Sequence, residues 1–444
     1  MKKHLENFAK THLHDYDELV RFQSVSAQEK QIPETAAYLA EQFENLGADT
    51  VEQWTDQSDS PVVFAEFKSK NSDKTVLFYN HYDVQPPEPF DEWETSPFEP
   101  TEKDGHIYGR GISDNKGELI SRLVLMKYFQ ENDNLPVNVK FFVEGEEEIG
   151  SLHVAEFVRA HKDQLKADVC VWEGGGKNSL DHYQVVGGMR GIVAFDVDVT
   201  TADVDMHSSL ASYADSATWR LVEGLSTLRD INGKILVEGF YDDCDELSEA
   251  EERVVAESDF DLANAKKASG LKKTVNTEHK TELVNRPTIS INGLKGGYQG
   301  DGVKTVIPRY ASAKLDCRLS PSQDPKKMAE LVQKHFDKHG FSDLHVHYKL
   351  GEHGYRSNFD HPFVQLTLKE AKDFYGQETK YLLNAAGGGP AYELGNVLEV
   401  PTVNIGVSYA GNKVHGPNEN IRVNDFYQGV AFLGNVLSKF GQKD

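Results

Sequence analysis

The sequence predicts a mixed α/β fold, with a mainly parallel sheet flanked by helices and a smaller inserted α+β domain. Three observations lead to this fold class. Buried-looking strands alternate with helical segments up to Trp172, the pattern changes near Gly187, and the first pattern returns from about Asp360. A chain of 444 residues, 39% of them hydrophobic, has material for more than one core.

The first pattern begins with helices, the last of which covers Ala36 to Leu46 with apolar residues at helical spacing. Strands and a helix then alternate, which is typical of βαβ units and a parallel sheet. In chain order, we predict strands at 62–65 and 75–79, a helix at 117–129, and strands at 137–143 and 169–172.

The second pattern begins with Ile192 to Val199, where every second residue is apolar, as in a strand with one exposed face. A β-α-β-β-α-β-like series follows, which is the chain order of ferredoxin-like domains. Its further members are a helix at 212–228, strands at 288–291 and 311–318, and a helix at 325–339.

The first pattern resumes with a helix at 363–375, a strand at 400–405 and a helix at 424–440. We therefore infer that the C-terminus completes the first domain. The predicted domains are residues 1–190 with 358–444, and the inserted residues 191–357. Within the insert, we interpret the acidic, helical segment Tyr241 to Asp261 as solvated surface.

The charge balance argues against two classes of partner. A formal net charge of -24, from 71 acidic and 47 basic residues, repels phosphate backbones and anionic lipid headgroups. No apolar run approaches the roughly 20 residues that span a bilayer, and the N-terminus lacks an apolar signal region. Three widely spaced cysteines fit a reducing compartment. We expect a cytoplasmic protein without nucleic-acid or membrane partners.

Two polar clusters follow predicted strands or precede a helix. His81 and Asp83 come after strand 75–79 and share one face of an extended chain, at the end where α/β sheets place their sites. An ordinary polar strand end is the alternative interpretation. Asp114 ends the glycine-rich loop 108–117, where it could equally cap the next helix.

Three further clusters follow other strands. Four glutamates lie within residues 144–148, and they repel one another unless cations neutralise them. A solvated acidic loop is the alternative. Glu173 follows strand 169–172 and precedes three glycines, and His415 follows strand 400–405. Each of these signals is weak alone.

Taken together, the clusters predict a two-metal hydrolytic site. Two histidines and three carboxylates suffice for two zinc ions when one carboxylate bridges them, and each ion keeps an open position. Glu147 is then spare and is the candidate general base. The predicted metal ligands, at the ends of successive strands, are His81, Asp114, Glu148, Glu173 and His415.

The motifs also resemble a known family. H-x-D at residue 81, G-R-G-x-x-D-x-K-G at 109–117, E-E-x-G-S at 147–151, an acidic residue after a strand and a late histidine occur in family order. They are similar to the di-zinc metallopeptidase family of carnosinase, cytosolic nonspecific dipeptidase, glutamate carboxypeptidase and aminoacylase. The resemblance covers nearly the whole chain.

The resemblance assigns roles to these residues. It implies that His81 and Glu173 bind one zinc, that Glu148 and His415 bind the other, and that Asp114 bridges them.

It also implies that Glu147 is the general base and that Asp83 orients His81. The register of the glutamate run follows from the family pattern, in which the E-E pair precedes x-G-S. A cis peptide bond is implied between Asp114 and Asn115.

Longer contexts at Trp93–Phe98 and Gly302–Pro308 resemble the dipeptidase branch of the family. In that branch the inserted domain serves as a lid and dimerisation domain, so the resemblance implies a homodimer. His207 would reach the partner subunit's active site and steady the oxyanion, although a lone histidine is more often a surface residue.

The resemblance further implies a pocket in which Arg318 binds the substrate carboxylate through its two-pronged guanidinium. Thr305, Gly388, Gly389 and His353 would complete that pocket.

The implied activity is metal-dependent hydrolysis of a peptide bond in dipeptides or other short peptides. Zinc is the expected metal of the two sites, and manganese or cobalt is the alternative. Two other functions stay open: an N-acyl amino acid deacylase or desuccinylase of the same family, and a non-catalytic binding protein on this fold.

Overall fold

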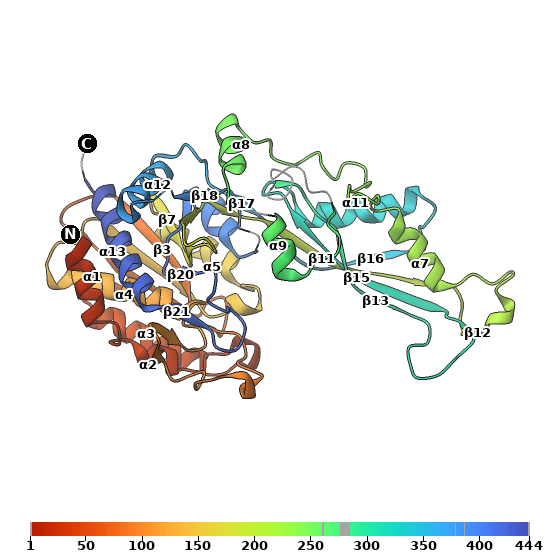
Figure 1. Cartoon of the computed structure of the whole chain (residues 1–444), viewed down its shortest axis with the longest axis horizontal. Coiled ribbons are helices and arrows are strands. Elements are labelled where there is room, and N and C mark those ends of the chain that lie inside the picture. The colour runs from red at the N-terminus through yellow and green to blue at the C-terminus, as the bar shows by residue number, and fades with distance from the viewer. Residues whose placement is uncertain (1, 260–261, 276–284, 378, 386, 443–444) are drawn as a thin grey trace.

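Two lobes make up the structure, and both chain termini lie on the larger one (Figure 1). The computed structural model describes residues 2–259, 262–275, 285–377, 379–385 and 387–442. We call the smaller lobe, which is built from the middle of the chain, the lid. No helix within those described ranges has the length and apolar character that crossing a membrane requires.

A ten-stranded sheet forms the centre of the larger lobe in the described part of the chain. Its strands are β1 (Thr50–Trp54), β2 (Val62–Phe67), β3 (Thr75–His81), β6 (Asn138–Glu144), β7 (Val169–Trp172), β8 (Gly176–Lys177), β9 (Tyr183–Val186), β18 (Lys380–Leu382), β19 (Thr402–Asn404) and β20 (Ser408–Tyr409). They lie in the order β1-β2-β6-β3-β7-β19-β9-β8-β20, with β18 beside β9. The middle strands β6, β3, β7 and β19 are parallel, and β3 and β6 are buried on both faces, so their sequences are continuous apolar runs.

Helices cover both faces of this sheet. They are α1 (Lys2–Thr11), α2 (Asp17–Arg21), α3 (Ile32–Asn45), α4 (Lys116–Glu131), α5 (Val154–Ala160), α6 (Lys162–Leu165), α12 (Pro362–Tyr375) and α13 (Val423–Phe440). One hydrophobic core joins α1, α3, α4, α12 and α13 to one face, and another, which includes Phe157 and Trp172, lies on the face under α5. Because α1 packs against α13, the first and last helices belong to the same lobe.

The lid contains an antiparallel sheet covered on one face by two helices. These elements are β11 (Gly191–Thr200), α7 (Ala217–Ser226), β13 (Ser290–Gly296), β15 (Tyr310–Leu319), α11 (Pro325–Lys338) and β16 (His345–Glu352). Their spatial order β13-β15-β11-β16 is the ferredoxin-like arrangement that the sequence predicts. Val193, Phe195, Val197 and Val199 are buried beside residues of α7 and α11, as the alternation in β11 predicts.

Short elements join the two lobes and support the loops. They are β4 (Thr101–Lys103), β5 (His106–Tyr108), β10 (Gly188–Met189), β12 (Met206–His207), β14 (Val306–Ile307), β17 (Tyr355–Arg356), β21 (Asn420–Arg422), α8 (Glu249–Ala256), α9 (Leu262–Ser269), and the single turns η1 (Ser26–Gln28), η2 (Phe90–Glu92), η3 (Glu147–Ile149), η4 (Ser208–Leu210) and η5 (Glu393–Val397). β10 pairs with β17 where the chain passes between the lobes. The domain boundaries at 190/191 and 357/358 stay a prediction.

The predicted mixed α/β fold class is confirmed, and two local expectations need correction. The helix predicted at 212–228 begins five residues later, at Ala217, because the backbone of Ser216 before it is still extended (φ -105°, ψ 123°). The acidic segment Tyr241 to Asp261 is not wholly solvated surface. Val255 in α8 is 3% exposed and joins the core of the larger lobe, and Glu251 forms an ion pair with Arg356.

Truncating a side chain in the lid core should lower the free energy of unfolding, whereas truncating an exposed side chain of the same sheet should not. Phe195 is 1% exposed within that core, so Phe195→Ala should lower the free energy of unfolding by about 3–5 kcal/mol. Tyr310, 43% exposed on β15, is the control, and Tyr310→Ala should change it by less than about 0.5 kcal/mol. Denaturant unfolding measures both variants, and equal effects would contradict the described core.

Candidate metal centre

The carboxyl ends of three parallel strands meet at one edge of the large sheet. β6, β3 and β7 are neighbours, so the residues that follow them converge. His81 ends β3, Glu147 and Glu148 form the turn η3 after β6, and Glu173 directly follows β7.

Asp114 and His415 come from two loops. Asp114 lies between β5 and α4, and His415 between β20 and β21. β5 belongs to a small sheet outside the central one, so Asp114 reaches the centre from a different sheet than His81 and the glutamates. Pairing of β21 with β5 brings the two loops together. The cap position of α4 is Asn115, and the Asp114–Asn115 bond is cis, as predicted.

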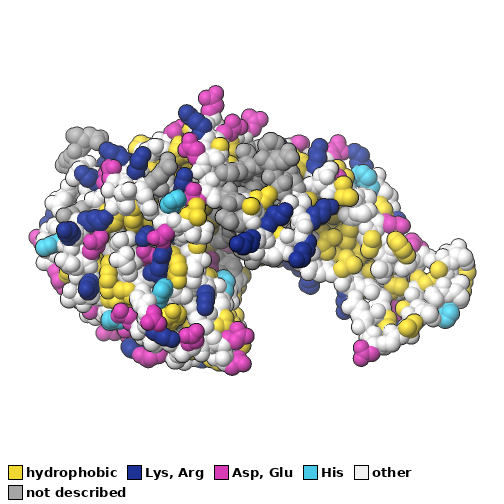
Figure 2. Space-filling view, viewed as in Figure 1, with side chains coloured by type: hydrophobic (Ala, Val, Ile, Leu, Met, Phe, Trp, Pro, Cys, Tyr) yellow, Lys and Arg dark blue, Asp and Glu magenta, His cyan; other side chains and the backbone are white. Residues whose placement is uncertain are grey.

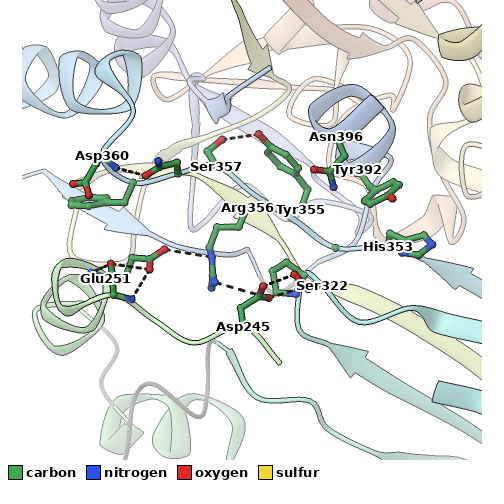
Figure 3. A pocket seen from close by; sticks show the side chains of 15 residues that line it. Asp245, Glu251, Ser322, His353, Tyr355, Arg356, Ser357, Asp360, Tyr392 and Asn396 are labelled. Carbon is green, nitrogen blue, oxygen red and sulfur yellow. Dashed lines mark hydrogen bonds and ion pairs between the residues drawn. The ribbon is translucent and has the colours of Figure 1, made fainter. Parts of the chain in front are cut away.

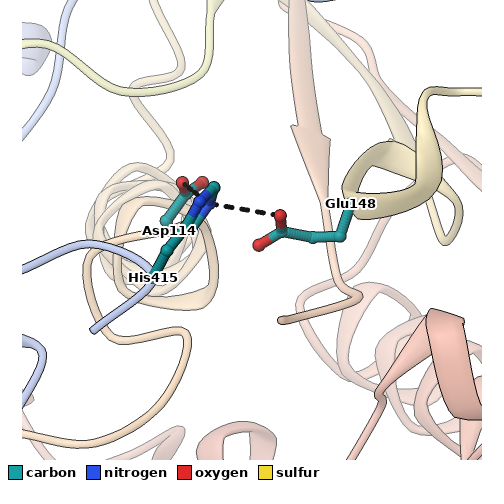
Figure 4. Close-up of side chains that lie close together, drawn as sticks. All are labelled: Asp114, Glu148 and His415. Atoms are coloured by element: carbon teal, nitrogen blue, oxygen red, sulfur yellow. Dashed lines mark ion pairs between the residues drawn. The ribbon is translucent and has the colours of Figure 1, made fainter. Parts of the chain in front are cut away.

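The carboxylate of Asp114 lies between two histidines. Its Oδ1 is 3.0 Å from His81 Nε2, and its Oδ2 is 3.3 Å from His415 Nε2. His81 Nε2 is also 3.4 Å from Glu173 Oε2, and His415 Nε2 is 3.2 Å from Glu148 Oε2, the contact drawn in Figure 4. All five predicted ligands are thus together, in two groups that share Asp114.

These distances suit divalent cations. Bonds of about 2.0–2.2 Å to a tetrahedral zinc ion place neighbouring ligand atoms about 3.3 Å apart, and imidazole nitrogens and carboxylate oxygens are its usual ligands. The four distances above range from 3.0 to 3.4 Å. Glu173 Oε2 is buried and has no hydrogen-bond partner within the described residues. A cation would satisfy that oxygen, so the residues present fit a two-metal site.

Asp83 holds His81 from the side opposite Asp114. His81 Nδ1 is 3.0 Å from the Asp83 carbonyl oxygen and 3.2 Å from Oδ1, and both side chains are fully buried. A proton on Nδ1 leaves the Nε2 lone pair free for a metal. The Asp83 carboxylate also accepts hydrogen bonds from the backbone N–H groups of Glu147 and Glu148, at 3.2 and 3.0 Å.

Hydrogen-bond and ion-pair partners divide the four glutamates of residues 144–148 into two pairs. Glu144 accepts hydrogen bonds from Tyr79 and Ser151, at 2.6 and 2.9 Å. Glu146 also has partners within the protein: it accepts a hydrogen bond from the Ser58 hydroxyl at 2.6 Å and forms an ion pair with His153. The remaining two, Glu147 and Glu148, face the histidines of the metal centre.

Buried negative charge shifts the pKa values of the centre. Burial raises the pKa of Glu147 to about 8, with His81 opposing the shift and Asp114 adding to it. Burial also holds the pKa of Glu173 well above its ordinary value. Hydrogen bonds that the ring of His415 donates to the carboxylates of Asp114 and Glu148 raise the pKa of His415 to about 10. Burial would lower the pKa of His81, but Glu173 and Asp114 outweigh it and hold that pKa well above its usual range. Bound cations would supply the positive charge that these carboxylates lack.

A buried ion pair, which sequence reasoning missed, holds the Asp114 loop in place. Glu419 accepts hydrogen bonds from Arg110 Nη1 at 2.7 Å and from three backbone N–H groups of the loop ending at Asp114, at 2.8 to 3.0 Å. Arg110 and Glu419 are each 1% exposed. In the sequence, the only signal for Glu419 is its place four residues after His415.

Arg122, fully buried on α4, was also missed. Its guanidinium donates to the carbonyl oxygens of Tyr79 and Trp172, each at 2.6 Å. These residues lie on β3 and β7, so Arg122 ties together the two strands that carry His81 and Glu173. Nothing in the local sequence distinguishes this arginine from one on a solvated helix face.

A cavity of about 470 Å³ has Glu147 in its wall. Four of the five predicted substrate-binding residues line it as well. Two of them belong to the end of the lid nearest the larger lobe, and two belong to residues 387–390 of the larger lobe, which we call the glycine loop. These four are Arg318, His353, Gly388 and Gly389.

The fifth, Thr305, does not line this cavity. Its hydroxyl lies 3.4 Å from His207 Nε2. His207 belongs to β12, which Figure 1 shows at the end of the lid farthest from the larger lobe. Within one chain, the structure therefore does not bring His207 or Thr305 to the metal centre.

A second cavity, of about 710 Å³, lies where the lid meets the larger lobe (Figure 3). Arg356 lies between two carboxylates there, 3.5 Å from Glu251 and 4.0 Å from Asp245. His353 and Tyr392, whose rings stack 4.4 Å apart, line both cavities. None of the predicted metal ligands lines the second cavity.

Comparison with known proteins identifies the family. The family description "Peptidase family M20/M25/M40" matches residues 77–439, most of the chain. The chain belongs to this peptidase family. It is therefore a metallopeptidase-type hydrolase, and the family membership that the motifs predict is confirmed.

Relatives and solved structures agree with this membership. The human "Beta-Ala-His dipeptidase" is 30% identical over 86% of this chain and 78% of its own length. The fission yeast "Cys-Gly metallodipeptidase dug1" is 29% identical over 90% and 89%. The M20 family metallo-carboxypeptidase Sso-CP2 from Sulfolobus solfataricus is 37% identical, covers 97% and 99%, and superimposes with a TM-score of 0.87. Human carnosine dipeptidase 1 is 27% identical with a TM-score of 0.78, covering 100% and 99%.

The Glu419 contacts predict an effect on metal affinity. Glu419→Gln leaves Arg110 buried without its carboxylate and loosens the Asp114 loop, so zinc affinity should fall by about 10- to 100-fold. Titration of the chelator-treated variant with zinc measures the loss. Glu330→Gln, exposed on α11, is the control and should bind zinc as the wild type does. Unchanged affinity in Glu419→Gln would contradict the positioning role.

Proposed function

We propose that the protein hydrolyses one peptide bond in dipeptides or other short peptides, using two divalent metal ions, with zinc as the expected metal. The observation that carries the proposal is the Asp114 carboxylate, with one oxygen toward His81 and the other toward His415. A single carboxylate shared by two ligand groups is the arrangement that a bridged metal pair requires.

In the proposed mechanism, His81, Glu173 and Asp114 would hold one ion, and Glu148, His415 and Asp114 would hold the other. When bound, the ions would supply the Lewis acidity that polarises a scissile carbonyl and acidifies a water molecule.

Glu147 is the general base: it accepts the proton of the attacking water and later donates it to the leaving amine. Its carboxylate lies 4.0 Å from His81 Nε2 in the wall of the cavity, where it can take the proton from the water and return it. Asp83 keeps His81 in the metal-binding tautomer. Arg318 lines the cavity that contains Glu147 and binds the terminal carboxylate of the peptide.

The names of the relatives support a peptide substrate of two residues, and one structure favours a second candidate. Sso-CP2, at 37% identity, is a carboxypeptidase, which would remove a C-terminal residue from longer peptides. Both reactions need a site for the terminal carboxylate. The N-acyl amino acid deacylase and the non-catalytic binding protein stay as further alternatives.

We also propose a homodimer through the lid, in which His207 and Thr305 of one subunit complete the site of the other. Hydrophobic side chains lie on the exposed lid surface next to the open notch between the lobes (Figure 2). Exposed apolar residues of the lid include Trp219, Ile231, Ile291 and Leu294, which are 66%, 85%, 53% and 49% exposed. Such exposure is typical of a contact surface.

Hydrolysis of a substrate panel tests the reaction class. Chelator-treated protein should be inactive, and added zinc or manganese should restore cleavage of Ala-Ala and Gly-Leu. N-acetyl amino acids and N-blocked longer peptides serve as comparison substrates. Cleavage of acyl amino acids alone would indicate the deacylase, cleavage of blocked peptides the carboxypeptidase, and no turnover with any metal the binding protein.

Glu147→Gln tests the general base. The variant keeps the shape of the side chain but cannot accept the proton, so kcat should fall by at least about 100-fold while zinc content stays unchanged. Steady-state kinetics and metal analysis of the same preparation measure both. Normal turnover would contradict the assignment.

Mixed dimers test the role of His207. His207→Ala should lose turnover with little change in zinc content. When this variant is mixed with Glu147→Gln, activity should return to about a quarter of the wild type, because about half of the dimers would be mixed and each has one complete site. Each variant alone is the control. An inactive mixture, or an active His207→Ala protein on its own, would contradict the proposed role of His207 in the partner subunit's site.

A further inference from the structure

Three neighbouring strands of the lid place Arg318, Ile192 and Glu352 in one row. Ile192 on β11 is directly opposite Arg318 on β15 and directly opposite Glu352 on β16. Opposed residues of antiparallel strands point to the same face of the sheet. That face is the one turned away from the lid core, and all three side chains line the cavity that contains Glu147.

The row has opposite charges at its ends and an apolar side chain between them. Opposed Cβ atoms in neighbouring strands are about 5 Å apart, so those of Arg318 and Glu352 are about 10 Å apart. No ion pair joins these two side chains in the ranges that the structure describes. Each charge can therefore face a ligand in the cavity.

Glu352 lies against the glycine loop of the larger lobe. A Cβ atom on Gly388 would lie 2.6 Å from Glu352 Oε2, so a side chain there would displace the carboxylate. A Cβ on Gly150, just after the Glu147 turn, would lie 3.9 Å from Oε1. Burial raises the pKa of Glu352, although Arg318 and the Gly389 N–H oppose the shift. The carboxylate is thus half-buried without a full cationic partner.

Other carboxylates of the cavity wall fit this role less well. Glu393 forms an ion pair with Arg159 at 3.1 Å. Glu156 is exposed on α5. Only Glu352 among these three lies in register with Arg318.

We propose that Glu352 is a specificity-determining residue that binds a cationic group on the same substrate molecule whose carboxylate Arg318 binds. The proposal rests on the proposed function, because Arg318 is its carboxylate site. An extended dipeptide spans about 7 Å, so one bound to Arg318 can present a cation to Glu352 across Ile192. The cation is either the free N-terminal amine or a basic side chain on the residue that carries the carboxylate. An N-acyl amino acid with a neutral side chain has neither.

Glu352→Gln tests the proposal, because it removes the charge and keeps the shape. We would measure kcat/KM for Gly-Leu and Gly-Lys, and the inhibition constant of N-acetyl-leucine as a competitor. The variant should lose about 10- to 100-fold in kcat/KM for a dipeptide that presents the cation, as expected for a lost charge-assisted hydrogen bond. The inhibition constant of N-acetyl-leucine should change by less than about twofold.

The two dipeptides separate the two sources of the cation. If kcat/KM falls for both Gly-Leu and Gly-Lys, Glu352 binds the N-terminal amine. If it falls for Gly-Lys alone, Glu352 binds the lysine side chain. Equal weakening of both dipeptides and N-acetyl-leucine would overturn the proposal, since it would mean that Glu352 only supports the Gly388 loop or Arg318. Unchanged kinetics with both dipeptides would overturn it too. Glu330→Gln, on the outer surface of the lid, is the control and should match the wild type.

Failure of the proposed function is a separate outcome. In that case wild-type protein would cleave neither dipeptide. Calorimetric binding of Gly-Leu, Gly-Lys and N-acetyl-leucine to zinc-loaded wild type and Glu352→Gln would then test the inference by the same pattern of losses.

Discussion

Negative charge buried at the carboxyl edge of the parallel strands is the constraint on which the rest of the structure depends. Asp114, Glu148 and Glu173 converge on only two histidines, with Glu147 beside them. Buried carboxylates without cations are costly: burial raises the pKa values of Glu147 and Glu173, and the nearby carboxylates raise the pKa values of both histidines. The charge that makes the site unfavourable without cations is the same charge that would give it affinity for divalent metal ions.

Hydrogen bonds from neighbouring side chains hold the ligand-bearing segments in place. Asp83 holds both His81 and the turn of Glu147, Glu419 holds the Asp114 loop, and Arg122 ties β3 to β7. Breaking a buried ion pair on one side costs about 3–5 kcal/mol, so these contacts matter for stability as well as for geometry. The same few side chains therefore hold the candidate metal centre in its geometry and stabilise the fold around it.

Local patterns predicted much of this arrangement. The apolar runs of β3, β6 and β7 and the polar residues after them indicated His81, the glutamate run 144–148 and Glu173, and the alternation in β11 identified one face of the lid core. Within the glutamate run, the choice of Glu147 and Glu148 came from the family pattern and not from a local signal. Strands of two or three residues, such as β8 and β20, are too short to show any periodicity. Arg110 and Glu419 are 309 positions apart, so no local pattern reveals their ion pair. The placement of Thr305 away from its own metal centre depends on the arrangement of the lobes, which no local pattern reveals, and for His207 only the family resemblance implied it.

The number of metal ions bound by one chain tests the central claim most directly. Chelator-treated protein would be titrated with zinc by calorimetry, and the metal content would be measured after removal of free ions. We expect two zinc ions per chain for the wild type, and loss of tight binding at both positions for Asp114→Ala, because both groups share that carboxylate. A wild-type chain that binds a single ion, or an Asp114→Ala chain that still binds two ions tightly, would contradict the shared two-metal centre.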